Sequence, residues 1–287
     1  MGVNFFDTAD TYGLGYGEEI LAKALNTRRQ DIIIGTKFGY DFYTHTTREG
    51  HKERPQKWTP SFIKYACEQS LKRLQTDYID LYQLHNPKMD AIENDELFET
   101  LDELVKEGKI RYYGFAIGPD IGWYEEGNAA IKKRNAQAMQ IIYSILEQDP
   151  TRAWFPAAEE EKTGLITRVP HASGMLDGTY SKETKFGTSD HRSHRRQQWL
   201  ETSLKKVEQL EFLPEGMGST IGQIAVKFAL SGPMVATVLP NITNLPQLHE
   251  FTATSETEDI SEDFLELVTE LYNNSFFLEE AESSLAS

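Results

Sequence analysis

Short apolar runs alternate along this chain with longer segments whose apolar residues recur every three or four positions. The runs are rich in Ile, Val, Phe, Tyr and Leu, and we expect strands at 3–7, 32–37, 78–85, 110–116, 138–142, 165–168 and 235–239. Their hydrophobicity is nearly continuous, which is typical of parallel strands that are covered on both faces. The longer segments are predicted to be the helices between them.

Three of these helices carry clear signals. Thr59 and Pro60 supply an N-cap and a proline at the first helical position, and the buried face that follows is predicted to contain Ile63, Cys67, Leu71 and Leu74. A second stripe consists of Leu97, Leu101, Leu104 and Val105, with Gly108 placed to end the helix. Leu265, Val268 and Leu271 indicate a last amphipathic helix.

Alternation of strands and helices implies a parallel sheet. A length of 287 residues is ordinary for one α/β barrel, and we expect a single domain over 1–287 with a (β/α)8 TIM-barrel fold. A doubly wound sheet is the alternative. The pattern supplies seven strands where a TIM barrel has eight, and an open barrel would expose two edges. Either a first βα unit is missing at the N-terminus, which we favour, or strand 3–7 pairs with strand 235–239 in a smaller ring.

The formal net charge of -16 argues against partners that require a basic surface, namely nucleic acid and membranes. No apolar run approaches the roughly 20 residues of a membrane span, and the first residues lack the features of a signal peptide. Cys67 is the single cysteine, so no internal disulfide can form. We therefore expect a cytoplasmic protein. His191 and His194 have no converging carboxylate, and no metal site is expected.

Four polar residues follow the predicted strands at the edge where barrels place their chemistry. They are Asp7, Tyr12, Lys37 and His85. Each alone has an ordinary interpretation, such as a helix cap, rim packing or a lysine that extends to solvent. Together they project toward one mouth of the barrel, which indicates a catalytic site.

The four residue types suit proton transfer to a carbonyl oxygen. A phenol titrates near ~10 in water, which is too high for efficient acid–base catalysis at neutral pH. A neighbouring ammonium favours the phenolate, a carboxylate keeps the ammonium charged and oriented, and an imidazole can hydrogen-bond the substrate oxygen. Such a set supplies no electrons, so a redox cofactor is needed.

The blocks "NFFDTADTYG", "IIIGTKFG", "SLKRLQTDYIDLYQLHNP" and "ELVKEGKIRYYGFA" resemble those of the aldo-keto reductases, and "HASGMLDGTY" and "QIAVKFAL…TVLP" resemble later blocks of that family. The resemblance runs from residue 2 to about residue 275. It implies a TIM barrel that binds NADP(H) without a Rossmann fold and reduces aldehydes or ketones to alcohols. It also implies that Tyr12 is the general acid–base, that Lys37 and Asp7 tune it, and that His85 orients the carbonyl.

The positions that bind the cofactor in the family are matched less closely than the four catalytic positions. Gln140 matches a glutamine that binds the nicotinamide carboxamide, whereas Ala116 and Ile117 replace a serine–asparagine pair of the family. Arg168 stands where an aromatic residue often stacks on the nicotinamide, and it is expected either to stack or to bind pyrophosphate. The further residues expected at the cofactor are Val169, Pro170, His171, Thr243, Asn244 and Gln247. The family's basic residue after the "LP" of 239–240 is absent, so NADP(H) is expected with NAD(H) as the alternative.

Two functional interpretations remain open at this point. One is a reductase of a small-molecule carbonyl substrate. The other is a nucleotide-binding regulatory subunit of a partner protein, since the family includes channel-associated β subunits. A homo-oligomer is possible with either. The long segments 38–58 and 170–192 are expected to be functional loops, and the basic stretch 189–196 either closes on phosphates or is a solvated helix start. Tyr40, Trp58 and Trp123 either line a substrate pocket or pack in the interior.

Overall fold

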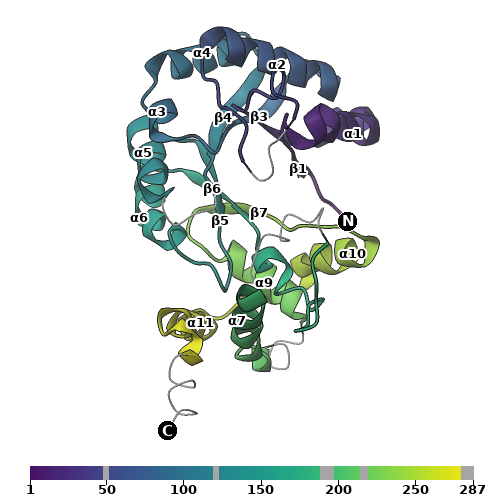
Figure 1. Cartoon of the computed structure of the whole chain (residues 1–287), viewed down its shortest axis with the longest axis vertical. Coiled ribbons are helices and arrows are strands. Elements are labelled where there is room, and N and C mark those ends of the chain that lie inside the picture. The colour runs from purple at the N-terminus through teal and green to yellow at the C-terminus, as the bar shows by residue number, and fades with distance from the viewer. Residues whose placement is uncertain (48–51, 119–122, 188–196, 214–218, 279–287) are drawn as a thin grey trace. The chain divides into compact units, whose positions relative to one another are not determined.

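Seven strands alternate with helices in the computed structural model (Figure 1), which describes residues 1–47, 52–118, 123–187, 197–213 and 219–278. The strands are β1 (Phe5–Asp7), β2 (Ile33–Phe38), β3 (Ile79–His85), β4 (Ile110–Ala116), β5 (Ala138–Ile142), β6 (Gly164–Arg168) and β7 (Val235–Leu239). All seven lie where the hydrophobic runs predicted them, with ends that differ by no more than two residues.

The strands form one sheet in the order β1-β2-β3-β4-β5-β6-β7. A doubly wound sheet would reverse its order partway, so that alternative is wrong. The fold is of the (β/α)8 TIM-barrel type, and the described residues supply seven of the eight strands. In this order β1 and β7 are the two ends and not neighbours, which disagrees with a smaller closed ring.

The described chain divides into two compact units. Unit 1 contains Met1, Ile142–Arg152 and Thr167–Ser287, and unit 2 contains Gly2–Ile141 and Ala153–Ile166. The single-domain assignment for 1–287 stays a prediction. Each unit is described by itself below.

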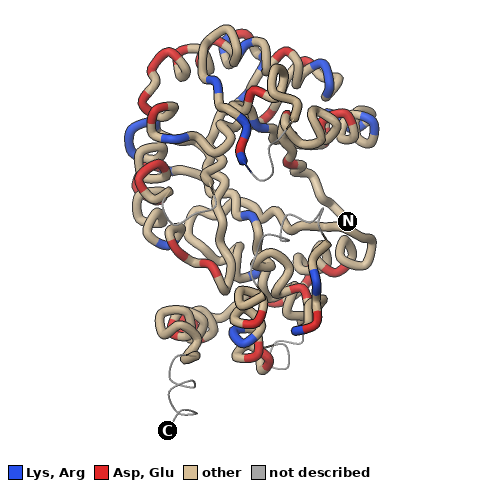
Figure 2. Tube along the Cα trace, viewed as in Figure 1, with Lys and Arg blue, Asp and Glu red and all other residues tan. Residues whose placement is uncertain are grey.

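Unit 2 contains β1 to β4, nearly all of β5, and the helices that follow these strands. The helices are α1 (Tyr16–Leu25), α2 (Pro60–Leu74), α3 (Met89–Ile92), α4 (Asp95–Lys106), α5 (Tyr124–Arg134) and most of α6 (Thr151–Glu161). They form an outer layer over the strands (Figure 1). The charged residues of this unit lie largely on these helices, whereas the strands are mostly uncharged (Figure 2).

The helix signals read from the sequence are mostly confirmed. Thr59 is the residue before α2 and Pro60 its first residue, although the Thr59 side chain makes no capping hydrogen bond. The predicted face of α2 is buried. In α4 the sequence predicted Val105 in the buried apolar stripe. This was wrong, because Val105 is 37% exposed at the edge of that stripe. Gly108 follows the end of α4 with a φ of 72°, a conformation that glycine adopts without strain.

Unit 1 contains β7 and the C-terminal helices. These are α7 (Gln197–Glu208), α9 (Ile221–Leu230), α10 (Leu245–Ala253) and α11 (Glu262–Asn273). Thr220 caps α9 with a complete capping box, because its hydroxyl accepts from Gln223 N while the Gln223 side chain accepts from Thr220 N. In α11 Val268 and Leu271 are buried and Leu265 is half-buried. No helix in the described part of the chain is both long and apolar enough to cross a membrane.

The register of β1 to β5 sets the positions of the candidate catalytic residues. Lys37 of β2 pairs with Gln83 of β3, and His85 at the end of β3 pairs with Ala116 of β4. Ala116 in turn pairs with Gln140 of β5. Because these strands are parallel, the residues at their carboxyl ends meet at one edge of the sheet.

Candidate active site

The four residues predicted to act together all belong to unit 2. Asp7 is the last residue of β1, His85 is the last residue of β3, and Lys37 is the penultimate residue of β2. Tyr12 opens a short 3-10 turn, Tyr12–Gly15, between β1 and α1. Three strand ends and one turn therefore bring the four side chains to the same edge.

Lys37 is at the centre of this group and is only 1% exposed. Its ammonium forms an ion pair with Asp7 Oδ2 and donates to Thr8 O at 2.8 Å. The other oxygen of Asp7 accepts hydrogen bonds from Gln83 Nε2 at 3.0 Å and from Gln140 Nε2 at 2.9 Å. Burying a charge is costly unless it is paired and hydrogen-bonded. Here both partners are satisfied, so the Lys37 ammonium is held in one position.

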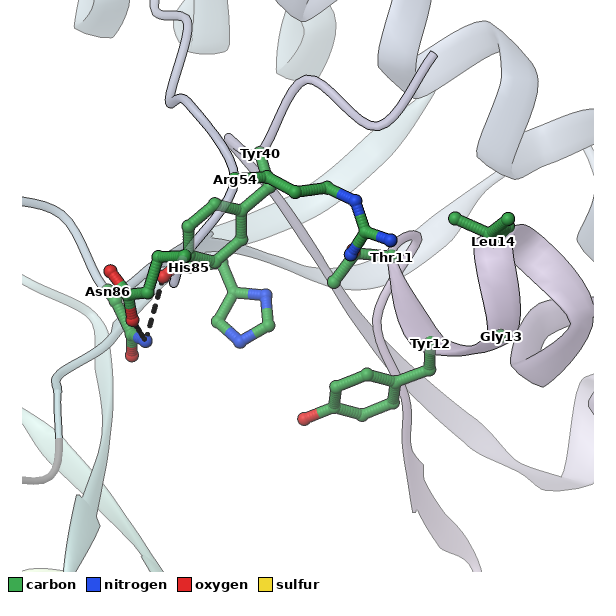
Figure 3. Close-up of a pocket in the computed structure, with 9 residues that line it drawn as sticks. Thr11, Tyr12, Gly13, Leu14, Tyr40, Arg54, His85 and Asn86 are labelled. Carbon is green, nitrogen blue, oxygen red and sulfur yellow. Dashed lines mark hydrogen bonds between the residues drawn. The ribbon is translucent and has the colours of Figure 1, made fainter. Parts of the chain in front are cut away.

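Tyr12 and His85 lie on the open side of this ion pair. The Lys37 ammonium is 5.3 Å from the centre of the Tyr12 ring, and Tyr12 as a residue is 47% exposed. The rings of Tyr12 and His85 meet edge to face with centroids 5.9 Å apart, and the Tyr40 ring packs on His85 at 5.0 Å. The Tyr12 hydroxyl and the His85 imidazole thus face the same open space (Figure 3).

The turn that carries Tyr12 depends on left-handed backbone. Tyr12 N donates to Ala9 O at 3.1 Å, which closes the turn after β1. Gly15 has a φ of 100°, and a Cβ at this position would lie 2.6 Å from Arg73 Cδ. Only glycine combines this backbone with this close approach. The "YGLGYG" sequence therefore forms a tight turn into α1.

The long loop after β2 is fixed by backbone pairing at its base. Tyr40 and Gln56 form an isolated antiparallel bridge, and Asp41 N donates to Pro55 O at 2.8 Å. Gln56 Nε2 then donates to the main-chain oxygens of His85, at 2.9 Å, and Asn86, at 2.8 Å. The loop is therefore tied to the strand end that carries His85.

A cavity of about 450 Å³ opens beside Tyr12 and His85. It is lined by Thr11, Tyr12, Gly13, Leu14, Tyr40, Glu53, Arg54, His85 and Asn86 (Figure 3). This volume is typical of a site for a small molecule. Tyr40 thus lines the cavity, whereas Trp58 and Trp123 are buried.

Two further carboxyl groups are buried behind the ion pair. Glu18 Oε1 accepts from Thr36 Oγ1 at 2.6 Å, and its Oε2 accepts from Arg73 Nε at 2.6 Å. Asp10 is also completely buried, but neither of its oxygens has a well-formed hydrogen bond. Burial, together with repulsion from Glu18, raises the pKa of Asp10 well above its ordinary value. Burial therefore favours the protonated form of Asp10, whereas Glu18 forms an ion pair with Arg73.

The cofactor residues expected around β6 lie in unit 1. Arg168 is the last residue of β6, Val169 has a φ of 61°, and Pro170 follows. The His171 ring is stacked on Phe251 with centroids 4.2 Å apart, and its Nε2 lies 3.1 Å from Gly222 O. Burial lowers the pKa of His171. The imidazole therefore packs inside its own unit, and contact with a cofactor at 168–171 stays a prediction.

The second expected cofactor group is at the start of α10. Asn244 caps this helix, because its Oδ1 accepts from Gln247 N at 2.9 Å. Gln247 Oε1 accepts from Thr243 N at 2.9 Å and from Thr243 Oγ1 at 2.8 Å. The three side chains form one exposed cluster at a helix N-terminus, where the helix dipole favours anions. The basic stretch 189–196 lies outside the described residues.

Gln140 is placed differently from the cofactor residues of unit 1. It is buried, and its amide group is already hydrogen-bonded to Asp7 and, at 3.4 Å, to Gln83 Oε1. Ala116 and Ile117, where the usual polar pair is absent, are buried as well. Gln140 therefore lies with the candidate catalytic residues, and its contact with a nicotinamide stays a prediction.

Several site residues were missed in the sequence. Gln83 could have been found, because it lies two positions before His85 and so shares its face of the strand. Gln56, Arg54 and Asn86 carry no comparable signal. Their placement depends on the path of the loop 39–57 and on the left-handed backbone of Asn86, whose φ is 49°.

Comparison with known proteins identifies relatives over nearly the whole chain. The model of the Aldo/keto reductase family matches residues 1–273. An uncharacterized oxidoreductase, YqkF of Bacillus subtilis, is 32% identical over 87% of this chain and 77% of its own length. A probable voltage-gated potassium channel subunit beta of Arabidopsis thaliana is 27% identical over 87% of this chain and 76% of its own.

A solved structure is similar as well. It is the holo form of the aldo-keto reductase AKR11C1 from Bacillus halodurans, which is 30% identical and has a TM-score of 0.73. The match covers 94% of this chain and 83% of that one.

Proposed function

Because the chain belongs to the aldo/keto reductase family and is thereby an oxidoreductase, we propose that it reduces aldehyde or ketone carbonyls to alcohols with NADP(H). Tyr12 gives the proton in this proposal. One observation carries it: the buried Lys37–Asp7 ion pair lies behind the Tyr12 ring, and the Tyr12 and His85 side chains face one cavity. A site that only bound a nucleotide would not require a buried ammonium next to a phenol.

Each of the four side chains has a separate task. The Tyr12 hydroxyl transfers its proton to the substrate oxygen as negative charge develops there. The Lys37 ammonium stabilises the phenolate that remains, and Asp7 keeps this ammonium charged and oriented. The His85 ring, held between Tyr40 and Tyr12, positions the carbonyl oxygen. The nicotinamide cofactor, when bound, supplies the hydride.

The residues present fit a dinucleotide. The Arg168 side chain and the N-terminus of α10, with Thr243, Asn244 and Gln247, provide a cation and hydrogen-bond donors for phosphate or ribose groups. Val169, Pro170 and His171 contribute backbone next to Arg168. In unit 2, Gln140 provides a buried amide beside Asp7. We propose NADP(H) as the cofactor, with NAD(H) as the alternative because the α10 cluster contains no cation.

A regulatory nucleotide-binding subunit with little catalysis is the weaker proposal. Its support is the likeness to a probable channel β subunit, and a likeness of this kind does not require the catalytic residues. The chain instead keeps all four of them in hydrogen-bonding or ring contact with one another or with their neighbours. That arrangement supports turnover.

Tyr12→Phe tests the proposed function. The substitution removes the transferable proton and keeps the ring that contacts His85. We expect turnover of a reactive aromatic aldehyde, followed as NADPH consumption, to fall by at least about 100-fold, which is a usual contribution of general acid catalysis. Cofactor affinity, measured by titration, should change little.

Tyr16→Phe is the matched control. Tyr16 lies four residues further along, at the start of α1, and is 61% exposed outside the cavity. It should retain wild-type turnover. Wild-type and Tyr12→Phe proteins with equal turnover would contradict the assignment of the proton donor. Absence of turnover in both, together with tight binding of NADPH, would support the regulatory subunit instead.

A further inference from the structure

We propose that the preferred substrates of this site carry an anionic group, a carboxylate or a phosphate, and that Arg54 binds it. This inference rests on the proposed reductase function and adds a substrate class to it. The observation behind it is a guanidinium that lines the catalytic cavity without a carboxylate partner among the described residues.

Arg54 is held in place by neutral acceptors. Its Nε donates to His45 O at 2.8 Å, its Nη2 to Thr46 O at 3.1 Å, and its Nη1 to Thr11 Oγ1 at 3.3 Å. A guanidinium has five N–H donors, so one N–H on each terminal nitrogen is left. A guanidinium with free N–H groups on both terminal nitrogens can donate to both oxygens of a carboxylate or phosphate. The positive charge of Arg54 is oriented by these bonds but not neutralised by them.

The position of Arg54 relative to the catalytic residues fits this role. Its guanidinium lies next to Thr11, the residue before Tyr12, and both line the cavity that His85 also lines. Figure 3 shows the Arg54 guanidinium next to Thr11, on the wall of the same cavity that Tyr12 and His85 line. A small molecule whose carbonyl oxygen reached Tyr12 and His85 would therefore have its far end within reach of Arg54.

The residues that directly follow Arg54 are fixed by backbone pairing. Arg54 precedes Pro55 and Gln56, and these two residues form the paired base of the loop through Asp41 and Tyr40. Gln56 is tied in addition to the end of β3. A side chain on a fixed base loses less entropy when it binds a ligand. The two hydrogen bonds from Gln56 that hold the end of β3 therefore also fix the distance between His85 and Arg54.

Glu53 supplies the opposing charge on the cavity wall. It is adjacent to Arg54 in sequence, but Asn86 Nδ2 donates to its Oε1 at 3.3 Å, and the same amide donates to Tyr40 OH at 3.0 Å. The Glu53 carboxylate thus accepts from Asn86, whereas Arg54 donates to Thr11 and to the main-chain oxygens of His45 and Thr46. Glu53 should weaken the attraction for anions, and its removal should strengthen it.

The experiment compares two aldehydes of nearly equal size. The probes are 4-carboxybenzaldehyde, an anion at neutral pH, and 4-formylbenzamide, its uncharged counterpart, together with the 3-substituted pair. The readout is the ratio of kcat/KM for the anionic over the neutral aldehyde with NADPH. We expect a ratio well above one for the wild-type chain, a fall of about 10- to 100-fold in Arg54→Gln, and partial recovery in Arg54→Lys.

Two variants sharpen the comparison. Glu53→Gln should raise the ratio severalfold, because it removes a negative charge from the same wall. Arg28→Gln removes a positive charge from an exposed ion pair with Asp31 elsewhere in unit 2, and it should leave the ratio at the wild-type value. The effect of Arg54→Gln should lie mainly in KM.

The outcomes separate this inference from the proposed function. Tyr12-dependent turnover with equal efficiency toward both aldehydes, unchanged in Arg54→Gln, would overturn the inference and leave the reductase standing. If no aldehyde is reduced, the reductase proposal fails, and calorimetric titration with 4-carboxybenzyl alcohol still tests Arg54. Weaker binding in Arg54→Gln would then support an anion site, and equal binding would refute it.

Discussion

Asp10 and Glu18 are two buried carboxyl groups in unit 2 that differ in how they are satisfied. Glu18 is bonded to Thr36 and Arg73, so its charge is compensated. Asp10 faces Glu18, Arg73 and Lys37, together with the phenols of Tyr43 and Tyr82, without a well-formed hydrogen bond. Burial opposes a negative charge on Asp10 more strongly than the nearby cations Arg73 and Lys37 favour it. The pKa of Asp10 is therefore raised, first by burial and then by the neighbouring Glu18 carboxylate, and both effects favour its protonated form.

This protonation predicts a pH dependence of stability. The pKa of Asp10 is raised in the folded chain by burial and then by Glu18, so above the ordinary aspartate value the folded state binds a proton that the unfolded state has lost. The free energy of unfolding should then fall as pH rises, by about 1.4 kcal/mol per pH unit. The fall should begin near pH 4 and end at the folded-state pKa.

Asp10→Asn should remove this slope. The amide is nearly isosteric and cannot ionise, and urea unfolding measured between pH 4 and pH 8 would give the slope in each protein. Asp31→Asn, at an exposed residue paired with Arg28, should keep the wild-type slope. An unchanged slope in Asp10→Asn would show that another group is responsible.

The positions of three of the four proposed catalytic residues were predictable because strand ends are predictable. Asp7, Lys37 and His85 end or nearly end apolar runs, and parallel strands bring such ends together. Arg54 and Gln56 were not predictable, because no periodicity indicates which residue of a long loop returns to the sheet. A side-chain bond to a main-chain oxygen, such as that from Gln56 to His85, leaves no pattern in the sequence.

At the scale of single elements, α4 offers a direct test of the helix assignment. Leu104 and Val105 are neighbours near its end, and both belong to the stripe read from the sequence. Leu104 is 0% exposed, whereas Val105 is 37% exposed. One position along the helix turns the side chain by about 100°, enough to move it from the core to the edge.

Leu104→Ala and Val105→Ala form a matched pair. Leu104→Ala should lower the free energy of unfolding by about 2–5 kcal/mol, because it removes transfer energy and leaves a cavity. Val105→Ala should cost less than about 1 kcal/mol, since alanine also has the higher helix propensity. Urea denaturation midpoints would measure both. Equal losses would mean that Val105 is as buried as the sequence pattern suggested.

At the scale of the whole molecule, the topology was the most predictable feature. Alternating strands and helices with right-handed connections leave few possible arrangements, and the strand order follows the sequence order. The cofactor contacts were less predictable. Arg168, Thr243, Asn244 and Gln247 belong to unit 1, whereas the proposed catalytic residues belong to unit 2. Thr243, Asn244 and Gln247 also lie outside the strands, so no strand register predicts their contacts.

The net charge of -16 is also a property of the whole chain. Acidic residues outnumber basic ones in the described helices, whose charged positions are coloured in Figure 2, and the proposed cofactor is itself a polyanion. At low ionic strength the charges of the chain act over roughly 30 Å, and at about 0.15 M they act over about 8 Å. Salt therefore screens a repulsion that operates before the cofactor reaches its site.

Cofactor capture should consequently become faster as salt is added. We expect kcat/KM for NADPH to rise between about 10 mM and 150 mM NaCl, because long-range repulsion lowers the association rate more than local contacts raise it. NADH lacks the 2′-phosphate and should show a smaller rise, so the ratio of kcat/KM for NADPH over NADH should increase with salt. Steady-state rates with 4-formylbenzamide, which is uncharged, would measure both. A ratio that falls with salt would instead mean that nearby cations such as Arg168 dominate, and that the acidity of the chain has little influence on cofactor choice.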